Sequence, residues 1–455
     1  MKYETVKQLI KTKIKREHLK SGDKLPSIRS LESQTGFSKA TIIKALTELE
    51  QAHLIYAIPQ RGYFVTGKPK AQPQHAVKFN FLAANPEATL FDFKQVHHCL
   101  DQVFQNFQSE ILSYGYADGL RSLRKQILHL LGDQQIFASV DRTFITSGAQ
   151  QALNIMLNVP FPNQRQNILI EQPTYAGLYK AAQITGNRVF GIDITQRHFN
   201  LKQLEAIFRN NEIKFFYVMP SFQNPTGHHY STAEKRQILA LAEQYDVYIV
   251  EDDFLGDLGT INEPNSFFAL DEHQRVIYLK SFSKIFLPSL RLAGVILPRN
   301  LVDNFLEYKK IYDLSSSNIS QEILATFIEN GMFALHLKKL RTHYQLKMKE
   351  LLRCCELYLP ADVKFFKPTS GFYTCLELPS QINSTKLTQQ LAQQDILVQD
   401  VAGMFLSYYQ NHTLIRLSIA EIPLANIEPG IKRISEVIRN DHQQQNSIFS
   451  DQFFI

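Results

Sequence analysis

Five short polar segments could do chemistry, and each directly follows an apolar run of the sequence: TSGAQQAL, EQPTY, PSFQNPTG, EDDF and SFSK. Lys284 in SFSK offers an amine that becomes nucleophilic where burial or neighbouring charges lower its pKa. The helix start at Gly148 offers backbone N–H donors to an anion. Each segment alone has an ordinary structural explanation, as a capped helix start, a turn or an acidic loop. Together they indicate a binding site.

The apolar runs before these segments predict a mostly parallel β-sheet covered by helices, which is an α/β fold. Strands are expected at residues 142–146, 167–171, 214–219, 247–251 and 276–280, and helical segments lie between them. Ligands of such sheets gather at the carboxyl ends of the strands, so the polar segments should converge. After about residue 315, long helices and the runs FYTCLEL and TLIRLSI predict a second, smaller α/β subdomain.

In this order, over residues 79–440, the five segments resemble fold-type I enzymes that use pyridoxal 5′-phosphate (PLP). The resemblance is strongest to the aminotransferase-like body of MocR-type regulators. It implies PLP as the cofactor, held by Lys284 in a Schiff base, the internal aldimine. It also implies cofactor-binding roles for Asp252, Asn224, Tyr175, Gly148, Ala149, Gln150, Ser281, Ser283, Arg291 and Tyr114.

The resemblance implies a different task for each cofactor residue. Asp252 would pair with the pyridinium nitrogen, Asn224 would bind the ring oxygen, and Tyr175 would stack on the ring. The phosphate would lie between Arg291, Ser281 and Ser283 on one side and the helix start at residues 148–150 on the other. A core tyrosine remains the alternative for Tyr175, and Glu251 and Asp253 would be solvated or structural neighbours.

Two further residues concern a partner subunit and an effector. Tyr114, in SYGYADGL, is similar to the family's tyrosine that reaches the phosphate of the neighbouring subunit, which implies a homodimer. Arg416, in TLIRLSIA, resembles the arginine that grips a substrate α-carboxylate. A structural arginine is its alternative.

The sequence departs from the family pattern at two places. Phe254 follows the acidic run where members usually carry Tyr, so a hydroxyl near the ring oxygen is missing. Ala83, Ala84 and Asn85 stand where the family usually has Gly near the substrate entrance. Both changes favour ligand sensing over efficient turnover.

The first 67 residues predict a helix over about residues 4–17, a helix–turn–helix and a β-hairpin, or wing. Ser27 and Ser38 are expected to cap the second and third helices. The run GDKLPSIRSLESQTGFSKATIIKALTELEQAHLIYAIPQRGYFV resembles the winged helix of the GntR regulator family, although Ile28 replaces the usual Glu. The resemblance places the following residues at double-stranded operator DNA: Ser27, Arg29, Ser38, Lys39, Thr41, Lys44, Arg61 and Gly62.

The charge distribution indicates that the first 67 residues, here called the head, bind a polyanion. Residues 1–70 contain 14 Lys or Arg against 6 Asp or Glu, whereas the other residues contain 35 against 37. No apolar run is long enough to span a membrane, and the charged N-terminus is not a secretory signal, so we expect a cytoplasmic protein. The four cysteines show no zinc-ligand spacing, and no metal is expected.

The domains expected are a winged-helix head (1–67), a linker (68–78), an aminotransferase-like body (79–442) and a tail (443–455). The body divides into a large subdomain (about 79–315) and a small one (about 316–442).

Three functions compete: a PLP-dependent transcription regulator that responds to PLP or an amino compound, an aminotransferase that kept a DNA-binding head, and a regulator whose body is a PLP-free scaffold. The basic head and the intact Lys284, Asp252 and Arg291 favour the first, with residual transaminase activity left open.

Overall fold

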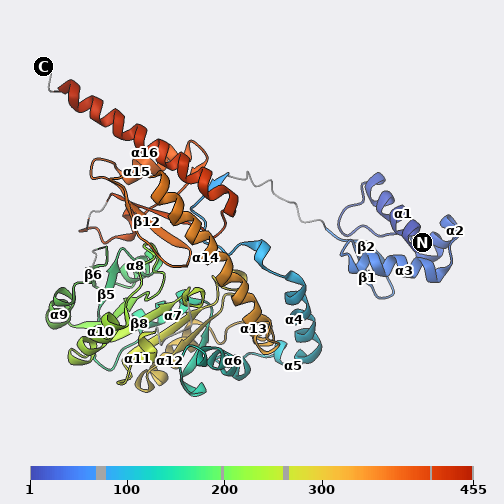
Figure 1. Ribbon diagram of the computed structural model, residues 1–455. Helices are drawn as coiled ribbons and strands as arrows, with labels where there is room; N and C mark the ends of the chain where they lie inside the picture. The colour runs from blue at the N-terminus through green and yellow to red at the C-terminus, as the bar shows by residue number, and fades with distance from the viewer. Residues whose placement is uncertain (1, 68–77, 196–198, 260–265, 410–411, 453–455) are drawn as a thin grey trace. The chain divides into compact units, whose positions relative to one another are not determined.

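The structure is a computed structural model that describes residues 2–67, 78–195, 199–259, 266–409 and 412–452, with the backbone alone from residue 442. The chain divides into two compact units, Met1–Ala76 and Val77–Ile455 (Figure 1). The linker expected at 68–78 lies outside the described residues, apart from Lys78.

The first unit contains the helices and the wing that the sequence predicts. Its elements are α1 (Lys2–Arg16), α2 (Ile28–Thr35), α3 (Lys39–Gln51), β1 (Ile55–Ile58) and β2 (Gly62–Val65), and the two strands pair antiparallel. The inward face predicted for α3, with Ile42 and Leu46, is buried against Val6 and Ile10 of α1. Leu9, which shares the apolar spacing of α1, is instead 41% exposed.

The two predicted serine caps differ in what their side chains bind. The Ser27 hydroxyl accepts a hydrogen bond from the Ser30 amide at 3.2 Å, as an N-cap does. Ser38 stands at the N-cap position of α3, but its side chain makes no bond to the helix backbone. Its hydroxyl lies 3.0 Å from that of Thr41, so the prediction of a side-chain cap at Ser38 is wrong.

The second unit contains the remaining helices and strands. Its strands are β3 (Phe79–Asn80), β4 (Thr143–Thr146), β5 (Asn167–Gln172), β6 (Val189–Asp193), β7 (Ile213–Val218), β8 (Tyr248–Asp253), β9 (Val276–Ser281), β10 (Ala293–Ile296), β11 (Lys364–Phe365), β12 (Tyr373–Glu377), β13 (Ile396–Leu397), β14 (Gln399–Asp400) and β15 (Leu414–Ser418). Its helices are α4 (Phe93–Asn106), α5 (Gln108–Ile111), α6 (Arg121–Gly132), α7 (Ala149–Asn158), α8 (Ala176–Ile184), α9 (Leu201–Asn210), α10 (Thr232–Gln244), α11 (Phe267–Leu270), α12 (Val302–Tyr312), α13 (Asn318–Glu329), α14 (Met332–Tyr358), α15 (Ser384–Ala392) and α16 (Leu424–Gln452).

A seven-stranded sheet in the order β4-β10-β9-β8-β7-β5-β6 forms the centre of the large subdomain. Strands β5 to β9 run parallel, whereas β10 is antiparallel to both β4 and β9. All five strands expected from the sequence are present, and β6 and β10 join them. The sheet is therefore mostly parallel, as predicted.

Helices cover both faces of this sheet, which is why its central strands are apolar throughout. Phe216 and Ile249 pack on one face against α9, α10 and α11. Their neighbours Phe215 and Val250 point to the opposite face, where α6, α7 and α8 contribute to the core. The same alternation determines to which face of the sheet each polar residue at a strand end points.

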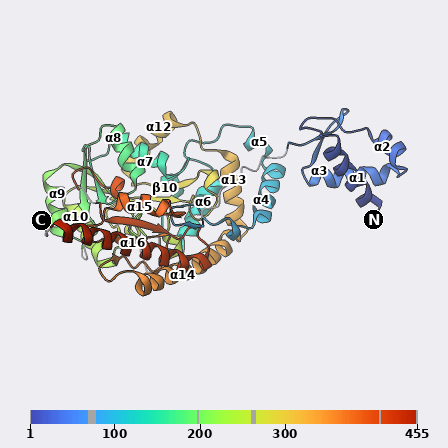
Figure 2. The same ribbon diagram turned by 90° about the horizontal axis from the view of Figure 1, so that it is seen from above.

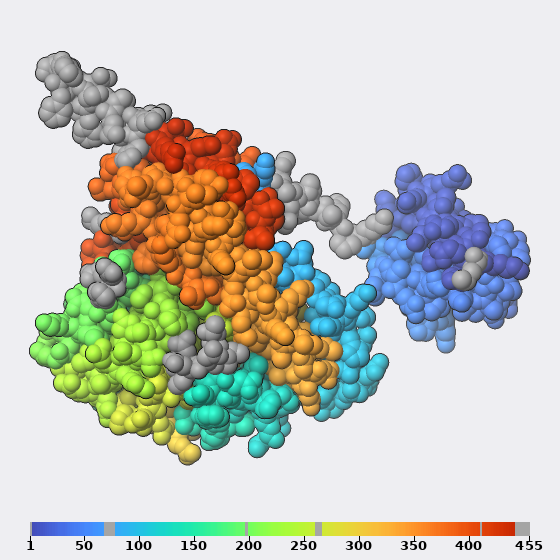
Figure 3. Space-filling model, in the orientation of Figure 1, coloured from blue at the N-terminus to red at the C-terminus, as the bar shows by residue number. Residues whose placement is uncertain are grey.

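The small subdomain is built on a four-stranded sheet in the order β11-β12-β15-β14. Helices α14 and α16 lie side by side along it (Figures 1 and 2). The space-filling view shows this orange-to-red C-terminal region packed against the green and yellow large subdomain (Figure 3).

Two boundaries differ from those drawn on the sequence. Residues Phe79 and Asn80 form β3, which pairs parallel with β13, so the start of the body belongs to the small subdomain. Helix α16 continues through Gln452, so residues 443–452 extend a helix rather than begin a separate tail. Within the described ranges, no helix has both the length and the apolar character that crossing a membrane requires.

Candidate functional site

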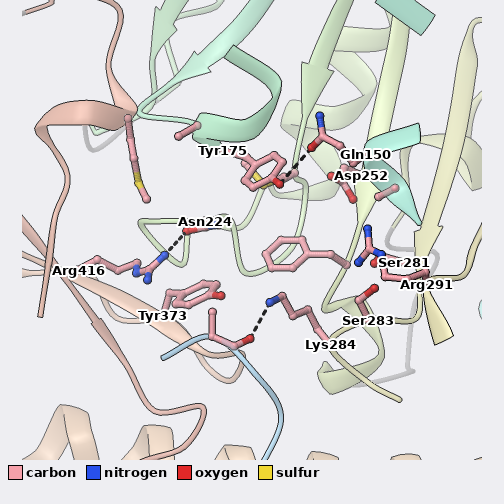
Figure 4. Close-up of a pocket in the computed structure, with 16 residues that line it drawn as sticks. Gln150, Tyr175, Asn224, Asp252, Ser281, Ser283, Lys284, Arg291, Tyr373 and Arg416 are labelled. Carbon is pink, nitrogen blue, oxygen red and sulfur yellow. Dashed lines mark hydrogen bonds between the residues drawn. The ribbon is translucent and has the colours of Figure 1, made fainter. Parts of the chain in front are cut away.

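One cavity, of about 340 Å³, gathers most of the predicted cofactor residues (Figure 4). Its lining is Ala84, Ala149, Gln150, Tyr175, Ala176, Met219, Asn224, Asp252, Phe254, Ser281, Ser283, Lys284, Arg291, Tyr373, Met404 and Arg416. Of the predicted set only Gly148 and Tyr114 are missing from it. The five polar segments thus converge at the carboxyl ends of their strands, as expected for a parallel sheet.

Lys284 lies just after β9 and points into this cavity (Figure 4). Its Nζ donates a hydrogen bond to the carbonyl oxygen of Ala84 at 2.7 Å. Burial lowers the pKa of Lys284 to about 8, and the nearby positive charges of Arg416 and Arg291 act in the same direction. A much larger share of its amine is therefore unprotonated at neutral pH than for an ordinary lysine.

Competitive labelling of the PLP-free protein with acetic anhydride, read peptide by peptide by mass spectrometry, should show this directly. We expect Lys284 to gain reactivity with a midpoint near pH 8, because burial and two guanidinium groups disfavour its charged form. Arg416→Gln should move the midpoint upward, since it removes one of these charges. A midpoint at the ordinary lysine value of 10.5 in the wild type would contradict the assignment.

Asp252, at the end of β8, has one satisfied and one unsatisfied carboxylate oxygen. Its Oδ2 accepts a 2.7 Å hydrogen bond from the hydroxyl of Tyr217, whereas its Oδ1 is buried and has no partner among the residues that the structure describes. Burial raises the pKa of Asp252 to about 7. An unpaired buried acceptor costs about 1–3 kcal/mol. A cationic N–H group bound in the cavity would remove that cost and hold the carboxylate ionised.

Glu251 and Asp253, on either side of Asp252 in sequence, have structural partners. The Glu251 carboxylate accepts the amides of Phe267 and Phe268 at 3.0 and 2.8 Å. Asp253 forms a buried ion pair with Lys280 at 2.7 Å. Of the two alternatives left open for these neighbours, the structural one is therefore observed.

An anion site is built where α7 begins beside Arg291. Gly148 has φ +84°, and a Cβ there would meet Arg291 Nη2 at 2.6 Å, so only glycine lets the guanidinium approach the helix start. The first amides of α7 have no carbonyl partner within the helix. Ser281 is buried and Ser283 half-buried on the same side of the cavity. Together these groups suit a phosphate.

The opposite end of the cavity holds Arg416, from β15. Its Nη1 donates to Asn224 Oδ1 at 2.9 Å and its Nη2 to the carbonyl of Leu82 at 3.1 Å. Within the described part of the chain, its Nε is buried and has no partner. The guanidinium also lies 4.5 Å from the ring centre of Tyr373. The Nε–H donor of Arg416 is thus available to a ligand anion.

Sequence reasoning missed several residues of the cavity, above all Tyr373. Its ring lies between Arg416 and the ring of Phe254, 6.4 Å from the latter, and its hydroxyl points into the cavity (Figure 4). Tyr373 therefore places a phenol beside the position where Phe254 lacks one. The run FYTCLEL predicts a strand, but its alternation does not reveal which side chain reaches the site.

Tyr175 and Gln150 also meet at this end of the sheet. The Tyr175 hydroxyl donates to Gln150 Oε1 at 3.2 Å, and the residue is 36% exposed and lines the cavity. A core tyrosine would be buried, so the alternative for Tyr175 does not describe its position. Tyr114 lies elsewhere, 88% exposed near Leu112 and Tyr116.

The predicted DNA-binding residues lie on the surface of the first unit. Arg29, Lys39, Lys44 and Arg61 are exposed, as are Ser27, Ser38 and Gly62, whereas Thr41 is half-buried. Lys44 Nζ lies 4.6 Å above the ring of Tyr3, which ties it to α1. Ile28, at the position where the family usually has Glu, packs against the core of this unit.

Comparison with known proteins agrees with the division of the chain into two units. Residues 83–434 match the model of class I and II aminotransferases. The chain belongs to this family. Residues 2–65 match the gntR family of bacterial regulatory proteins, so this member carries a DNA-binding head on its aminotransferase-like body, which is the MocR-type architecture. It is a GntR-family DNA-binding regulator.

Relatives with and without the head are similar to this chain. An uncharacterised HTH-type transcriptional regulator of Bacillus subtilis, YcxD, is 35% identical over 95% of this chain and 98% of its own length. Aromatic-amino-acid aminotransferase 1 of Thermococcus litoralis is 29% identical over 78% of this chain and 87% of its own. The crystal structure of a multiple substrate aminotransferase from Thermococcus profundus has a TM-score of 0.75 at 24% identity, covering 82% of this chain and 93% of that one, and it shows the fold.

Proposed function

We propose that this regulator binds PLP through Lys284 and that PLP, or an amino compound bound beside it, changes the affinity of the head for operator DNA. The observation that supports this most strongly is the buried Oδ1 of Asp252, which lies in the same cavity as Lys284 and has no hydrogen-bond partner in the described ranges. A protein keeps such an atom without a partner where a ligand supplies one.

The cavity fits PLP at each of its polar ends. Asp252 would hold the pyridinium nitrogen, Lys284 the aldehyde carbon, and Arg291 with Ser281, Ser283 and the start of α7 the phosphate. When bound, PLP would supply an aldehyde that condenses with a primary amine, releasing one water, and a ring that withdraws electrons. Lys284 suits the amine because its lowered pKa leaves a much larger share of it unprotonated near neutral pH than for an ordinary lysine.

An effector with a carboxylate would bind at the Arg416 end. Arg416 is 5% exposed, its Nε has no partner among the described residues, and Asn224 holds the guanidinium in place. A planar guanidinium binds a carboxylate with two parallel hydrogen bonds. An amino acid, which carries both an amine and a carboxylate, would therefore span from Lys284 to Arg416.

The functional form is a homodimer in this proposal. Leu112 and Tyr114 are 89% and 88% exposed, and Tyr116 is 73% exposed, so residues 112–116 offer an apolar surface to a second copy. Large exposed apolar groups that lie together favour an interface. In a dimer Tyr114 would reach the phosphate end of the partner's cavity.

The test is DNA affinity as a function of the occupant of the cavity. Operator fragments would be selected from fragmented genomic DNA with the wild-type protein. Their Kd would then be measured by fluorescence anisotropy for the apo form, with PLP, and with PLP plus single amino acids. We expect one of these additions to change Kd by about 5- to 150-fold, the usual range of allosteric coupling. Lys284→Ala should bind the same DNA and lose the response.

Two results would contradict the proposal. Equal Kd values in all conditions for the wild type would mean that the body does not regulate the head through this cavity. Rapid transamination of an amino acid with no change in Kd would favour the aminotransferase function instead.

A further inference from the structure

Residues 78–91, here called the arm, form the first described segment of the small subdomain after the linker. The arm passes along the cavity, which its Ala84 lines. Three successive carbonyl oxygens of the arm accept hydrogen bonds from side chains, two of which, Arg416 and Lys284, line the cavity. Leu82 accepts from Arg416 Nη2 at 3.1 Å, Ala83 from the hydroxyl of Ser418, and Ala84 from Lys284 Nζ at 2.7 Å. The last bond is visible in Figure 4, where the blue backbone passes below Lys284.

Residues on both sides of this crossing are firmly held. Upstream, Phe81 is fully buried, and its carbonyl accepts the Ser418 amide at 2.8 Å. Downstream, the Glu87 carboxylate accepts from His343 Nε2 at 3.0 Å and pairs with Lys347 Nζ at 3.1 Å. Residues 82–86 therefore form a short bridge between two anchors, and the bonds to the cavity residues set its conformation.

Two of the three donors that hold the bridge are the ones that the proposed ligands use. After Lys284 has condensed with the aldehyde of PLP, its nitrogen keeps at most one hydrogen. The nitrogen must also turn away from Ala84 and toward the cofactor. A carboxylate on Arg416 competes with the carbonyl of Leu82 for the same guanidinium. When the cavity is filled, the bond of Ser418 alone would remain of the three.

We propose that the arm occupies the donors of the empty cavity as an internal substitute for the ligand, and that filling the cavity releases residues 82–86. This inference rests on the proposed function, since it takes PLP and an amino acid as the ligands.

Backbone amide exchange of the full-length protein tests the release. The amides of Leu82 and Ala83 donate to Asn80 Oδ1 at 3.1 and 3.2 Å, so their exchange rates report on the bridge. We expect PLP to speed their exchange about tenfold, and leucine added with PLP to speed it further, because each lost hydrogen bond weakens local protection. Unchanged or slower exchange in both ligand states would overturn the proposal.

A variant separates the arm from cofactor chemistry. Lys284→Met keeps most of the apolar stem but donates no hydrogen bond to Ala84. Without any ligand, its bridge amides should exchange as fast as those of the PLP-loaded wild type. Lys180→Met, an exposed lysine on α8, is the matched control and should exchange like the unloaded wild type. Slow exchange in unloaded Lys284→Met would overturn the proposal.

The failure of this inference is distinguishable from that of the proposed function. Absorbance of the same samples shows whether PLP is bound at all. If PLP binds and DNA affinity responds, but the exchange of the bridge amides does not change, the ligand does not release the arm. If PLP does not bind the wild type, the proposed function fails first, and the unloaded Lys284→Met comparison still decides whether Lys284 holds the arm.

Discussion

Purified Lys284→Ala protein should lack the yellow absorbance of covalently held PLP that we expect for the wild type. The reason is that an alanine has no amine to condense with the aldehyde, whereas Asp252 and Arg291 remain to bind the cofactor only by contact. The loss of the covalent band should be complete, while weak PLP binding should persist. Reduction with borohydride followed by peptide mapping measures the covalent fraction and the position of the adduct.

The control for this loss is another lysine. Lys180→Ala, which removes an exposed amine on α8, should keep both the colour and the label. A label on any lysine other than Lys284 would reject the assignment of the cofactor site, and so would a wild type that takes up no label.

DNA binding by the head should become less dependent on salt when Arg29 or Lys39 is replaced by alanine. Both side chains are exposed, at the starts of α2 and α3, where helix N-termini and cations meet phosphates. Each substitution should weaken binding and reduce the slope of log Kd against log salt by about one unit. Mobility shifts at several salt concentrations give these slopes.

The matched control removes the same charge from another helix. Lys15→Ala lies on α1, is equally exposed and lies outside the predicted contact set, so its slope should equal that of the wild type. Slopes that are unchanged in both Arg29→Ala and Lys39→Ala would place the DNA on a different surface of the head.

Much of the architecture could be predicted from the sequence because its signals are local. Parallel strands covered on both faces are continuous apolar runs, so β5, β7, β8 and β9 stand out without any tertiary information. The polar residues that follow such strands must meet at one edge of the sheet. The convergence of Asp252, Asn224 and Lys284 was therefore predictable in outline, as were the buried positions of α3.

The tertiary structure alone decided which groups complete each site. Ser38 bonds to Thr41 rather than to the backbone of α3, although its position is that of a cap. Strand β10 is too short for its sequence to show a periodicity that would predict it. Its antiparallel direction is set by its two neighbours. Tyr373 reaches the cavity from a strand that lies 89 residues beyond Lys284 in the sequence.

The arm shows most clearly why the sequence could not suffice. Its contacts with Arg416 and Lys284 are made by the carbonyl oxygens of Leu82 and Ala84, across 334 and 200 residues of chain. A backbone carbonyl is the same at every residue, so neither residue type nor spacing marks the one that a distant side chain will find. The side chains of each local segment determine which strands form and what chemistry the ends of those strands can carry. Which backbone groups lie against that chemistry depends on how the subdomains pack, and this is set by the whole chain.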